Sequence, residues 1–411
     1  MKILVINQPI NNRGDESAHK ALLRRIQAAL PEAIITVLFE NEKEDSVQQF
    51  AVQSEKISYV NKRYGKIKCR GMGFAMNAGL KYGLRFLWSL QPYIRDLINL
   101  YKQSDCVLCA PGGMCLGGFQ NWHHLFLLML AKYTGKPLFY YGRSIGPFPE
   151  KTPDNVKFKE LSSEILHYAS FLSLRDKKSE EYAKEIGISK YVSVVDSAFL
   201  DAPLKKVPLT LSNKIGESRY IVFVPNLLIW HPAYKGKIEK STLVDFYAEI
   251  IDVVMRKYPS HKILMLPQTF NYSTRDENDV NLFRGIVKIM DNDRVVAIDD
   301  TYSSDVQQTI ISEADFVIGM RYHSIVFAIN NAIPFIALSY EHKIVGLLKA
   351  LNKTESLVDI EKLIMSKEGR AEILRQIKNR IIIGEKDYLT QRKSKEIAMN
   401  GFNIFMSVLK K

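Results

Sequence analysis

Apolar residues in the first half of the chain fall in short runs that are separated by segments with helical spacing. The runs predict strands at 3–6, 34–39, 106–110, 138–141, 171–174 and 192–195. The amphipathic segments between them predict helices at 18–30, 122–133, 156–168 and 178–186. Strands that alternate with helices are typical of an α/β domain with a parallel sheet.

The alternation resumes after a polar, proline-containing stretch at 201–218. It predicts strands at 220–224, 262–266, 295–298, 316–320 and 335–338, helices at 241–257, 278–290 and 303–312, and an amphipathic tail at 388–409. A chain of 411 residues is longer than a single core usually supports. We therefore expect two doubly wound, Rossmann-like domains that face each other across a cleft. Their expected bounds are 1–205 and 206–380, followed by a helical tail, 381–411, that packs back on the N-terminal domain.

The most informative stretch is 314–343, where a strand is followed directly by charged residues. Arg321, His323 and Ser324 come after the apolar run 316–320, and Lys343 follows the next predicted strand. The carboxyl ends of parallel strands converge on one crevice, and helix amino ends there favour anions. Arg321, His323 and Lys343 are therefore expected to face a ligand that carries phosphate or carboxylate groups.

Further chemical groups follow strands in the first half. Asp15 opens the first helix, where it could cap the helix or serve as an active-site carboxylate. Gly112 and Gly113 form a loop whose backbone could approach a ligand, although a plain turn is an equal interpretation. Arg143 lies two residues after the apolar run 138–141, and Arg175 directly follows the run 171–174, which suggests either anion binding or structural ion pairs. Asp196 closes another apolar run, and a buried structural carboxylate is the favoured interpretation there.

Taken in order, these residues resemble the polysaccharide pyruvyl transferase family over most of the chain. The motifs that carry the resemblance are Asn12-Arg13-Gly14-Asp15, Asp105 to Gly113, Ser173-Leu174-Arg175-Asp176, Asp196 to Phe199, and Ile318 to Ser324 with Tyr340 and Lys343. The last is the most specific, although Tyr322 stands where the family usually has leucine. The resemblance implies a glycosyltransferase-B-like fold.

The resemblance also implies an activity: pyruvate passes from phosphoenolpyruvate to two sugar hydroxyls, giving a cyclic ketal and phosphate during capsule or exopolysaccharide synthesis. His323 then protonates the enol methylene and Asp15 accepts a hydroxyl proton. The donor is held by Arg321, Lys343, Ser324 and one or both of Arg143 and Arg175. The acceptor, expected to be a lipid-linked oligosaccharide, contacts Asn12, Gly14, Gly112 and Gly113. No metal or cofactor is implied beyond the donor substrate.

The net charge of +13 is unevenly distributed. The segment 62–95 has eight basic residues and no acidic one, interleaved with aromatic residues that include Tyr82, Phe86 and Trp88. This composition suits the inner face of a membrane or a lipid phosphate, and an ordinary solvated helical face fits equally well. No nucleic-acid-binding motif accompanies it, so nucleic acid is not an expected partner.

Four cysteines make no disulfide framework, and Cys106 and Cys109 lie in an apolar run, so buried thiols in a reducing cytoplasm are expected. Two other functions remain open for this sequence. One is a nucleotide-sugar glycosyltransferase on the same two-domain scaffold, since fold does not fix function. The other is a non-catalytic module that binds lipid-linked glycans or membranes.

Overall fold

The computed structural model describes residues 1–411 apart from 9–11, 64, 204, 232, 270–277 and 300. The chain forms two compact units. Unit 1 comprises Met1–Ile10, Ala18–Leu200 and Ile397–Lys411, and unit 2 comprises Asn11–Ser17 and Asp201–Glu396. The first helix and the last helix therefore each begin in unit 2 and continue in unit 1.

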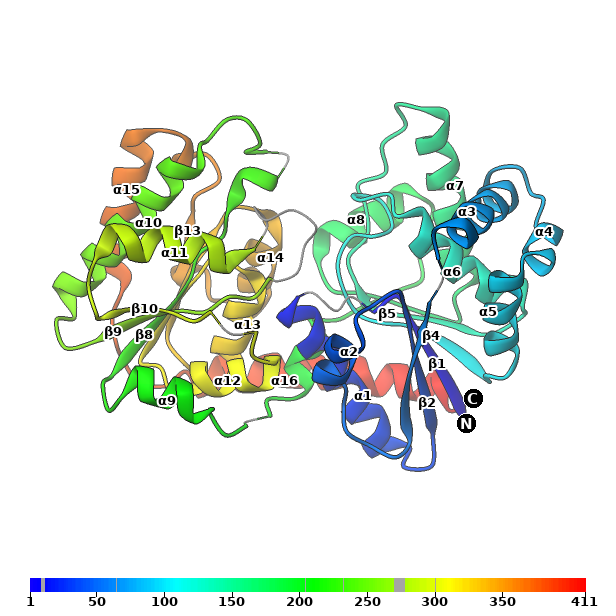
Figure 1. The fold of residues 1–411 in the computed structure, drawn as a ribbon, viewed down its shortest axis with the longest axis horizontal. Coiled ribbons are helices and arrows are strands. Elements are labelled where there is room, and N and C mark those ends of the chain that lie inside the picture. Colours follow the sequence, from blue (N-terminus) through cyan, green and yellow to red (C-terminus); the bar gives the residue numbers. More distant parts are fainter. Residues whose placement is uncertain (9–11, 64, 204, 232, 270–277, 300) are drawn as a thin grey trace. The chain divides into compact units, whose positions relative to one another are not determined.

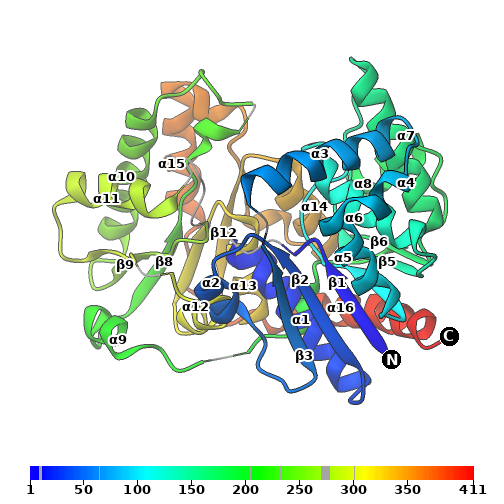
Figure 2. The ribbon, with the colours of Figure 1, turned by 45° about the vertical axis from the view of Figure 1, so that its right-hand side comes forward.

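Unit 1 is a parallel sheet in the order β3-β2-β1-β4-β5-β6-β7 (Figure 1). Its strands are β1 (Lys2–Ile6), β2 (Ile34–Glu40), β3 (Ile57–Lys62), β4 (Cys106–Cys109), β5 (Leu138–Arg143), β6 (Phe171–Leu174) and β7 (Val192–Ser193). Figure 2 shows β1, β2 and β3 side by side. The helices are α1 (Arg13–Ala29), α2 (Glu44–Phe50), α3 (Lys66–Lys81), α4 (Phe86–Leu90), α5 (Pro92–Lys102), α6 (Trp122–Tyr133), α7 (Pro153–Tyr168) and α8 (Lys177–Glu185).

Unit 2 is a second parallel sheet, in the order β10-β9-β8-β11-β12-β13. Its strands are β8 (Tyr220–Val224), β9 (Lys262–Met265), β10 (Val295–Ala297), β11 (Phe316–Gly319), β12 (Phe335–Ser339) and β13 (Leu357–Asp359). The helices are α9 (Leu209–Ile215), α10 (Lys240–Lys257), α11 (Asp279–Met290), α12 (Ser304–Ser312), α13 (Tyr322–Asn330), α14 (His342–Leu351) and α15 (Lys367–Arg380), followed by α16 (Tyr388–Leu409).

The prediction of two parallel-sheet α/β domains is confirmed. The two edge strands β3 and β13 were not predicted, and α9 lies inside the stretch expected to be a linker. Strand β3 is only half-buried along most of its length, so its sequence lacks the continuous apolar run of the inner strands. The C-terminal end of α16 packs in unit 1, where the ring of Phe405 contacts Phe139, Tyr141 and Phe171.

Cys106 and Cys109 are buried, as predicted, and burial raises the pKa of their thiols to about 12 and about 11, which keeps both protonated.

Among the helices of the described residues, none combines the length and apolar composition that crossing a bilayer requires.

Candidate functional site

The strand order of unit 2 reverses direction between β8 and β11. From β8 the chain proceeds outward through β9 and β10, then returns by α12 to β11 on the other side of β8. In doubly wound sheets, ligands bind at the carboxyl ends of the strands where the order reverses. Asn226 follows β8 at this edge, and Arg321 and His323 follow β11. The most specific sequence motif therefore lies at the expected ligand-binding edge.

Arg321 is held by a buried carboxylate that was not predicted from the sequence. Its Nη2 donates to Oδ1 of Asp279, a residue with no exposed surface in the first turn of α11. The other carboxylate oxygen of Asp279 accepts from the backbone N–H groups of Gln268 and Thr269, each at 3.0 Å. A buried charge is stable only when it is paired and hydrogen-bonded, and these contacts satisfy both conditions. Asp279 thus fixes Arg321 and the loop after β9 together.

His323 lies in the first turn of α13 and is 7% exposed. Its ring packs against the backbone of Gly14 so closely that a Cβ atom at position 14 would lie 1.8 Å from Nδ1. Both residues belong to unit 2. Glycine is required at position 14 because any side chain there would displace the imidazole.

The start of α1 is held in unit 2 by several contacts. The side-chain oxygen of Asn12 accepts from the N–H of Gly14 at 2.7 Å, and Arg13 forms a buried ion pair with Glu16 at 3.0 Å. Glu16 also accepts from the backbone and hydroxyl of Ser304, each at 3.1 Å, at the start of α12. The helix cap is therefore Asn12, which corrects the interpretation of Asp15 as the cap. Asp15 is half-buried and directly follows Gly14 in the chain.

Lys343 and Ser324 occupy neighbouring positions at the same edge of the sheet. Lys343 is in the first turn of α14, after β12, which pairs with β11. Its Nζ lies 3.5 Å from Oε1 of Glu341. The hydroxyl of Ser324 donates to the carbonyl of Arg321 at 2.5 Å, so it supports the first turn of α13. The sequence motifs predicted a common edge for Arg321, His323 and Lys343, and the strand pairing provides one.

Arg143, in unit 1, is fully buried and faces the glycine loop. Its guanidinium donates to the carbonyl oxygens of Ala110 at 2.5 Å and Asn7 at 3.3 Å, and its Nη2 lies 3.3 Å from Sγ of Cys115. A Cβ atom at Gly112 would lie 3.1 Å from Nη2 of Arg143. These contacts give Arg143 a structural role, because it holds the loop after β4 against the end of β1. A contact with the donor stays a prediction for this arginine.

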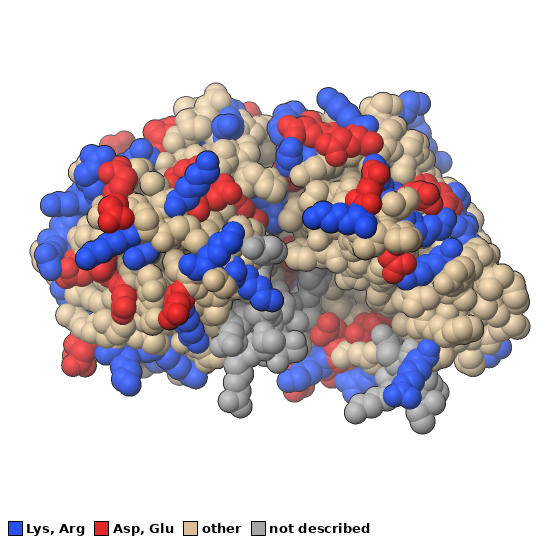
Figure 3. Space-filling model, turned by 90° about the horizontal axis from the view of Figure 1, so that it is seen from above, with Lys and Arg blue, Asp and Glu red and all other residues tan. Residues whose placement is uncertain are grey.

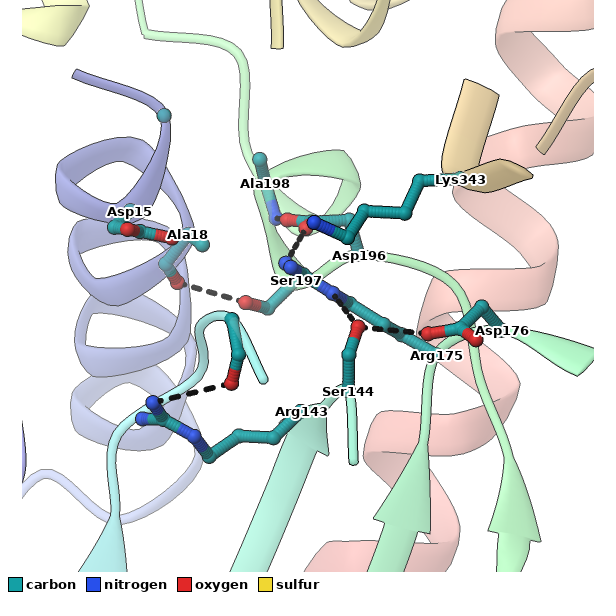
Figure 4. Close-up of polar contacts among 12 residues, drawn as sticks. Asp15, Ala18, Arg143, Ser144, Arg175, Asp176, Asp196, Ser197, Ala198 and Lys343 are labelled. Atoms are coloured by element: carbon teal, nitrogen blue, oxygen red, sulfur yellow. Dashed lines mark hydrogen bonds and ion pairs between the residues drawn. The ribbon is translucent and has the colours of Figure 1, made fainter. Parts of the chain in front are cut away.

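Arg175 belongs to a polar network at the ends of β5 and β6, which Figure 4 shows. Its Nη1 pairs with Oδ2 of the fully buried Asp196 at 2.5 Å, and its Nε donates to the hydroxyl of Ser144 at 3.1 Å. Ser144 in turn donates to Asp176 at 2.7 Å, and Asp176 caps α8 through the N–H of Ser179. Asp196 is a buried structural carboxylate, as its position after an apolar run indicates.

The partners that hold the candidate residues were not predicted from the sequence. Asp279 and Glu16 are acidic residues in ordinary helical contexts, and no local pattern marks them. Asn12 was predicted to bind the acceptor, yet its side-chain oxygen is engaged in the cap. Within the described parts of the chain, no cluster of three or more His, Cys, Asp or Glu residues could hold a metal ion.

Comparisons with known proteins identify the family of this chain. The profile of the family described as polysaccharide pyruvyl transferase matches residues 12–342. The chain belongs to this family. It is 26% identical over 382 residues to the amylovoran biosynthesis protein AmsJ of Erwinia amylovora, a match that spans 88% of this chain and 89% of that protein. The protein is therefore a pyruvyltransferase enzyme that acts in polysaccharide biosynthesis.

Solved structures support the fold alone. The UDP-GlcNAc 2-epimerase of Neisseria meningitidis superposes with a TM-score of 0.58 at 13% identity, over 100% of this chain and 99% of that one. The UDP-GlcNAc 2-epimerase of Methanocaldococcus jannaschii gives 0.56 at 12% identity, over 99% and 100%. Both belong to the glycosyltransferase-B type of fold, so the fold implied by the sequence motifs is confirmed.

The packing of Gly14 against His323 generates a first prediction. Gly14→Ala should lower pyruvyl transfer by about 100-fold, because displacing a reacting group by roughly 1 Å costs that much. Both pyruvyl transfer and thermal unfolding are measured for the variant, so that a loss of activity is distinguished from a loss of stability. Gly71→Ala, in α3, is the matched control, since a Cβ atom there meets nothing within 4 Å. Full activity in Gly14→Ala would show that the orientation of His323 is unimportant.

Proposed function

We propose that the enzyme takes its pyruvyl group from phosphoenolpyruvate and places it on two hydroxyls of a sugar as a cyclic ketal. The observation that carries the proposal is the position of Arg321 and His323 at the start of α13, on the edge where the strand order of unit 2 reverses. A small enol that bears both phosphate and carboxylate needs a fixed guanidinium and nearby cations. Arg321, fixed by Asp279, and Lys343 supply these charges.

The reaction balances with the residues named. His323 gives a proton to the enol methylene, which becomes a methyl group, and positive charge develops on the carbon that carries the phosphate. One sugar hydroxyl attacks that carbon and loses its proton. The second hydroxyl then displaces phosphate and also loses its proton. Of the two hydroxyl protons, one replaces the proton given to the methyl group and the other leaves with phosphate.

The remaining candidate residues take supporting roles in this proposal. Asp15, beside Gly14, accepts one hydroxyl proton. Arg321, Lys343 and Ser324 hold the donor. Arg143 and Arg175 stay candidate anion contacts of unit 1, although Arg143 is fully buried among backbone carbonyls. Cationic side chains neutralise the leaving phosphate, so the proposal calls on no metal. Gly112 and Gly113 present backbone to a sugar acceptor, which we take to be lipid-linked.

Membrane association is proposed for the same segment, 62–95, although some of the side chains named from the sequence do not support it. Lys81 pairs with Asp154 at 2.6 Å and Arg85 with Glu164 at 3.3 Å, so acidic residues of α7 compensate these bases. Trp88 has no exposed surface and packs on Phe126, so its expected role at a membrane is wrong. Tyr64 and the side chains of Lys66 and Lys68 lie outside the described residues.

The same helices carry exposed apolar side chains instead. Phe74, Tyr82, Phe86 and Leu90 are each at least 60% exposed, and Arg70 and Arg95 are exposed on the same segment. At the right-hand edge of Figure 3, the side on which α4 lies in Figure 1, the surface has few charged side chains. Exposed apolar side chains gathered on one segment, with basic residues nearby, suit a bilayer with anionic headgroups.

His323→Ala should lower turnover by about 100- to 10,000-fold, the usual effect of losing a general acid. Phosphate release from phosphoenolpyruvate, measured with a panel of galactoside and mannosamine glycans, provides the assay. Tyr322→Leu, which introduces the residue usual in the family, is the neighbouring control. Turnover within a few-fold of the unaltered enzyme, in a folded His323→Ala protein, would remove His323 from this role.

Arg321→Lys should weaken donor binding and should not behave as a conservative change. Lysine provides a point charge and cannot bridge Asp279 and a substrate anion with a planar fork. Titration calorimetry with phosphoenolpyruvate measures the effect, and Arg219→Lys, at an exposed ion pair with Asp315, is the control. Unchanged affinity in Arg321→Lys would move the donor site elsewhere.

Membrane binding should depend on Phe86 and Leu90. Loss of one buried apolar side chain costs about 1.5–3 kcal/mol, so Phe86→Ser or Leu90→Ser should lower vesicle partitioning by roughly 10-fold or more. Flotation with anionic vesicles tests this, with Leu389→Ser as a control at another highly exposed leucine, in α16. If all three variants float like the unaltered protein, or nothing floats, the segment is an ordinary solvated face.

A further inference from the structure

A cluster of three titratable side chains lies at the carboxyl edge of the unit 1 sheet and has no part in the proposed donor chemistry. Nε2 of His123 lies 2.6 Å from Oε2 of Glu40, and the hydroxyl of Tyr93 donates to Oε1 of the same carboxylate at 2.6 Å. Glu40 is the last residue of β2, Tyr93 is in the first turn of α5, and His123 is in the first turn of α6. Three separate elements therefore converge on one carboxylate.

Doubly wound sheets bind ligands at the point where the strand order reverses, and the cluster of Glu40, Tyr93 and His123 lies at that point of unit 1. The strand order reverses between β1 and β4, because the chain runs outward from β1 to β3 and returns to β4 on the other side. Asn7, directly after β1, donates its side-chain N–H to the carbonyl of His124 at 3.2 Å. The loop with Gly112 and Gly113 leads from β4 into α6. His123 thus lies at the reversal point, beside the glycine loop.

The hydrogen bond to Glu40 determines which ring nitrogen of His123 can accept a proton. An ionised carboxylate only accepts hydrogen bonds, so Nε2 of His123 is the donor to Glu40. The amino ends of α5 and α6 favour a negative charge near their first turns, where the carboxylate of Glu40 lies. Nδ1 of the neutral ring then carries a lone pair, and within the described residues it makes no hydrogen bond. The side chain of His123 is 34% exposed, so a substrate can reach it, whereas Glu40 is 11% exposed.

We infer that unit 1 binds the acceptor at this edge and that His123 is a catalytic base there, accepting the proton of one acceptor hydroxyl. Glu40 acts as a positioning residue that orients the ring and stabilises the imidazolium, and Tyr93 holds Glu40. A base that a buried acid orients through its second nitrogen is a recurrent arrangement for activating a hydroxyl. The inference rests on the proposed function, in which two hydroxyls each release a proton. His123 accepts one of these protons, which then passes through the solvent to the leaving phosphate.

The charged and titratable groups around His123 are consistent with this role. Glu40 faces it from β2, Tyr93 approaches Glu40 from α5, and His124 is the next residue on α6. Burial and the nearby Arg143 lower the pKa of His124, so His124 stays neutral and adds no competing charge. Glu40 is therefore the carboxylate that contacts His123.

The test uses the full-length enzyme and the phosphate-release assay with an acceptor. His123→Ala should lower turnover by about 100-fold or more, and added imidazole should restore a large part of it, since imidazole can occupy the space of the lost ring. His123→Gln keeps a donor for Glu40 but has no base, so it should also lose turnover. Glu40→Gln should lower turnover by a smaller factor. His167→Ala, an exposed histidine on α7, is the matched control and should behave like the unaltered enzyme.

Calorimetry with phosphoenolpyruvate separates this inference from the proposed function. Donor affinity in the His123 variants should match that of the unaltered enzyme. Turnover within a few-fold in folded His123→Ala and His123→Gln overturns the inference, and so does a loss that imidazole fails to restore in His123→Ala. If the unaltered enzyme binds no phosphoenolpyruvate, the proposed donor is wrong, which is a separate failure.

Discussion

The close approach of Gly14 to the imidazole of His323 is the constraint on which the rest of unit 2 depends. A ring that lies within van der Waals distance of a backbone can be oriented only if that backbone is itself immobile. The buried ion pair of Arg13 with Glu16, and the bonds from Glu16 to Ser304, supply that rigidity. Removing one member of such a pair leaves a buried charge without its partner, which is strongly destabilising. The start of α1 is therefore built as part of the site, although the helix continues into unit 1.

Both sheets fix a charged arginine at the end of a strand in the same way. Each has an arginine after the carboxyl end of a strand that pairs with a fully buried aspartate: Arg321 with Asp279 and Arg175 with Asp196. A guanidinium has five N–H donors, so one edge can bind the aspartate while another faces an anion. The buried acid also limits the rotamers of the arginine, which reduces the entropy lost when a substrate binds. Arg143 differs, because its donors engage backbone carbonyls and hold a loop in place.

Local patterns in the sequence predict the inner strands, many of the helices and the position of Arg321 and His323, because these depend on short apolar runs and on the residues directly after each run. Local patterns do not predict the edge strands β3 and β13, because these strands bury less apolar surface. They do not predict Asp279 or the pair of His123 with Glu40 for another reason. Glu40 and His123 are 83 residues apart in the chain, and only the sheet order brings them together. The position of 11–17 in unit 2 likewise depends on long-range contacts that no local pattern contains.

The central claim is that the enol methylene of phosphoenolpyruvate is protonated while its phosphate leaves, so that the pyruvyl group becomes a ketal. The most direct measurement is to run the reaction in deuterated water with a competent acceptor and to determine the product by NMR and mass spectrometry. We expect a ketal whose methyl group carries a single deuterium atom, with equimolar release of phosphate. A product that retains the vinyl methylene, or a methyl group with no deuterium, would contradict the claim.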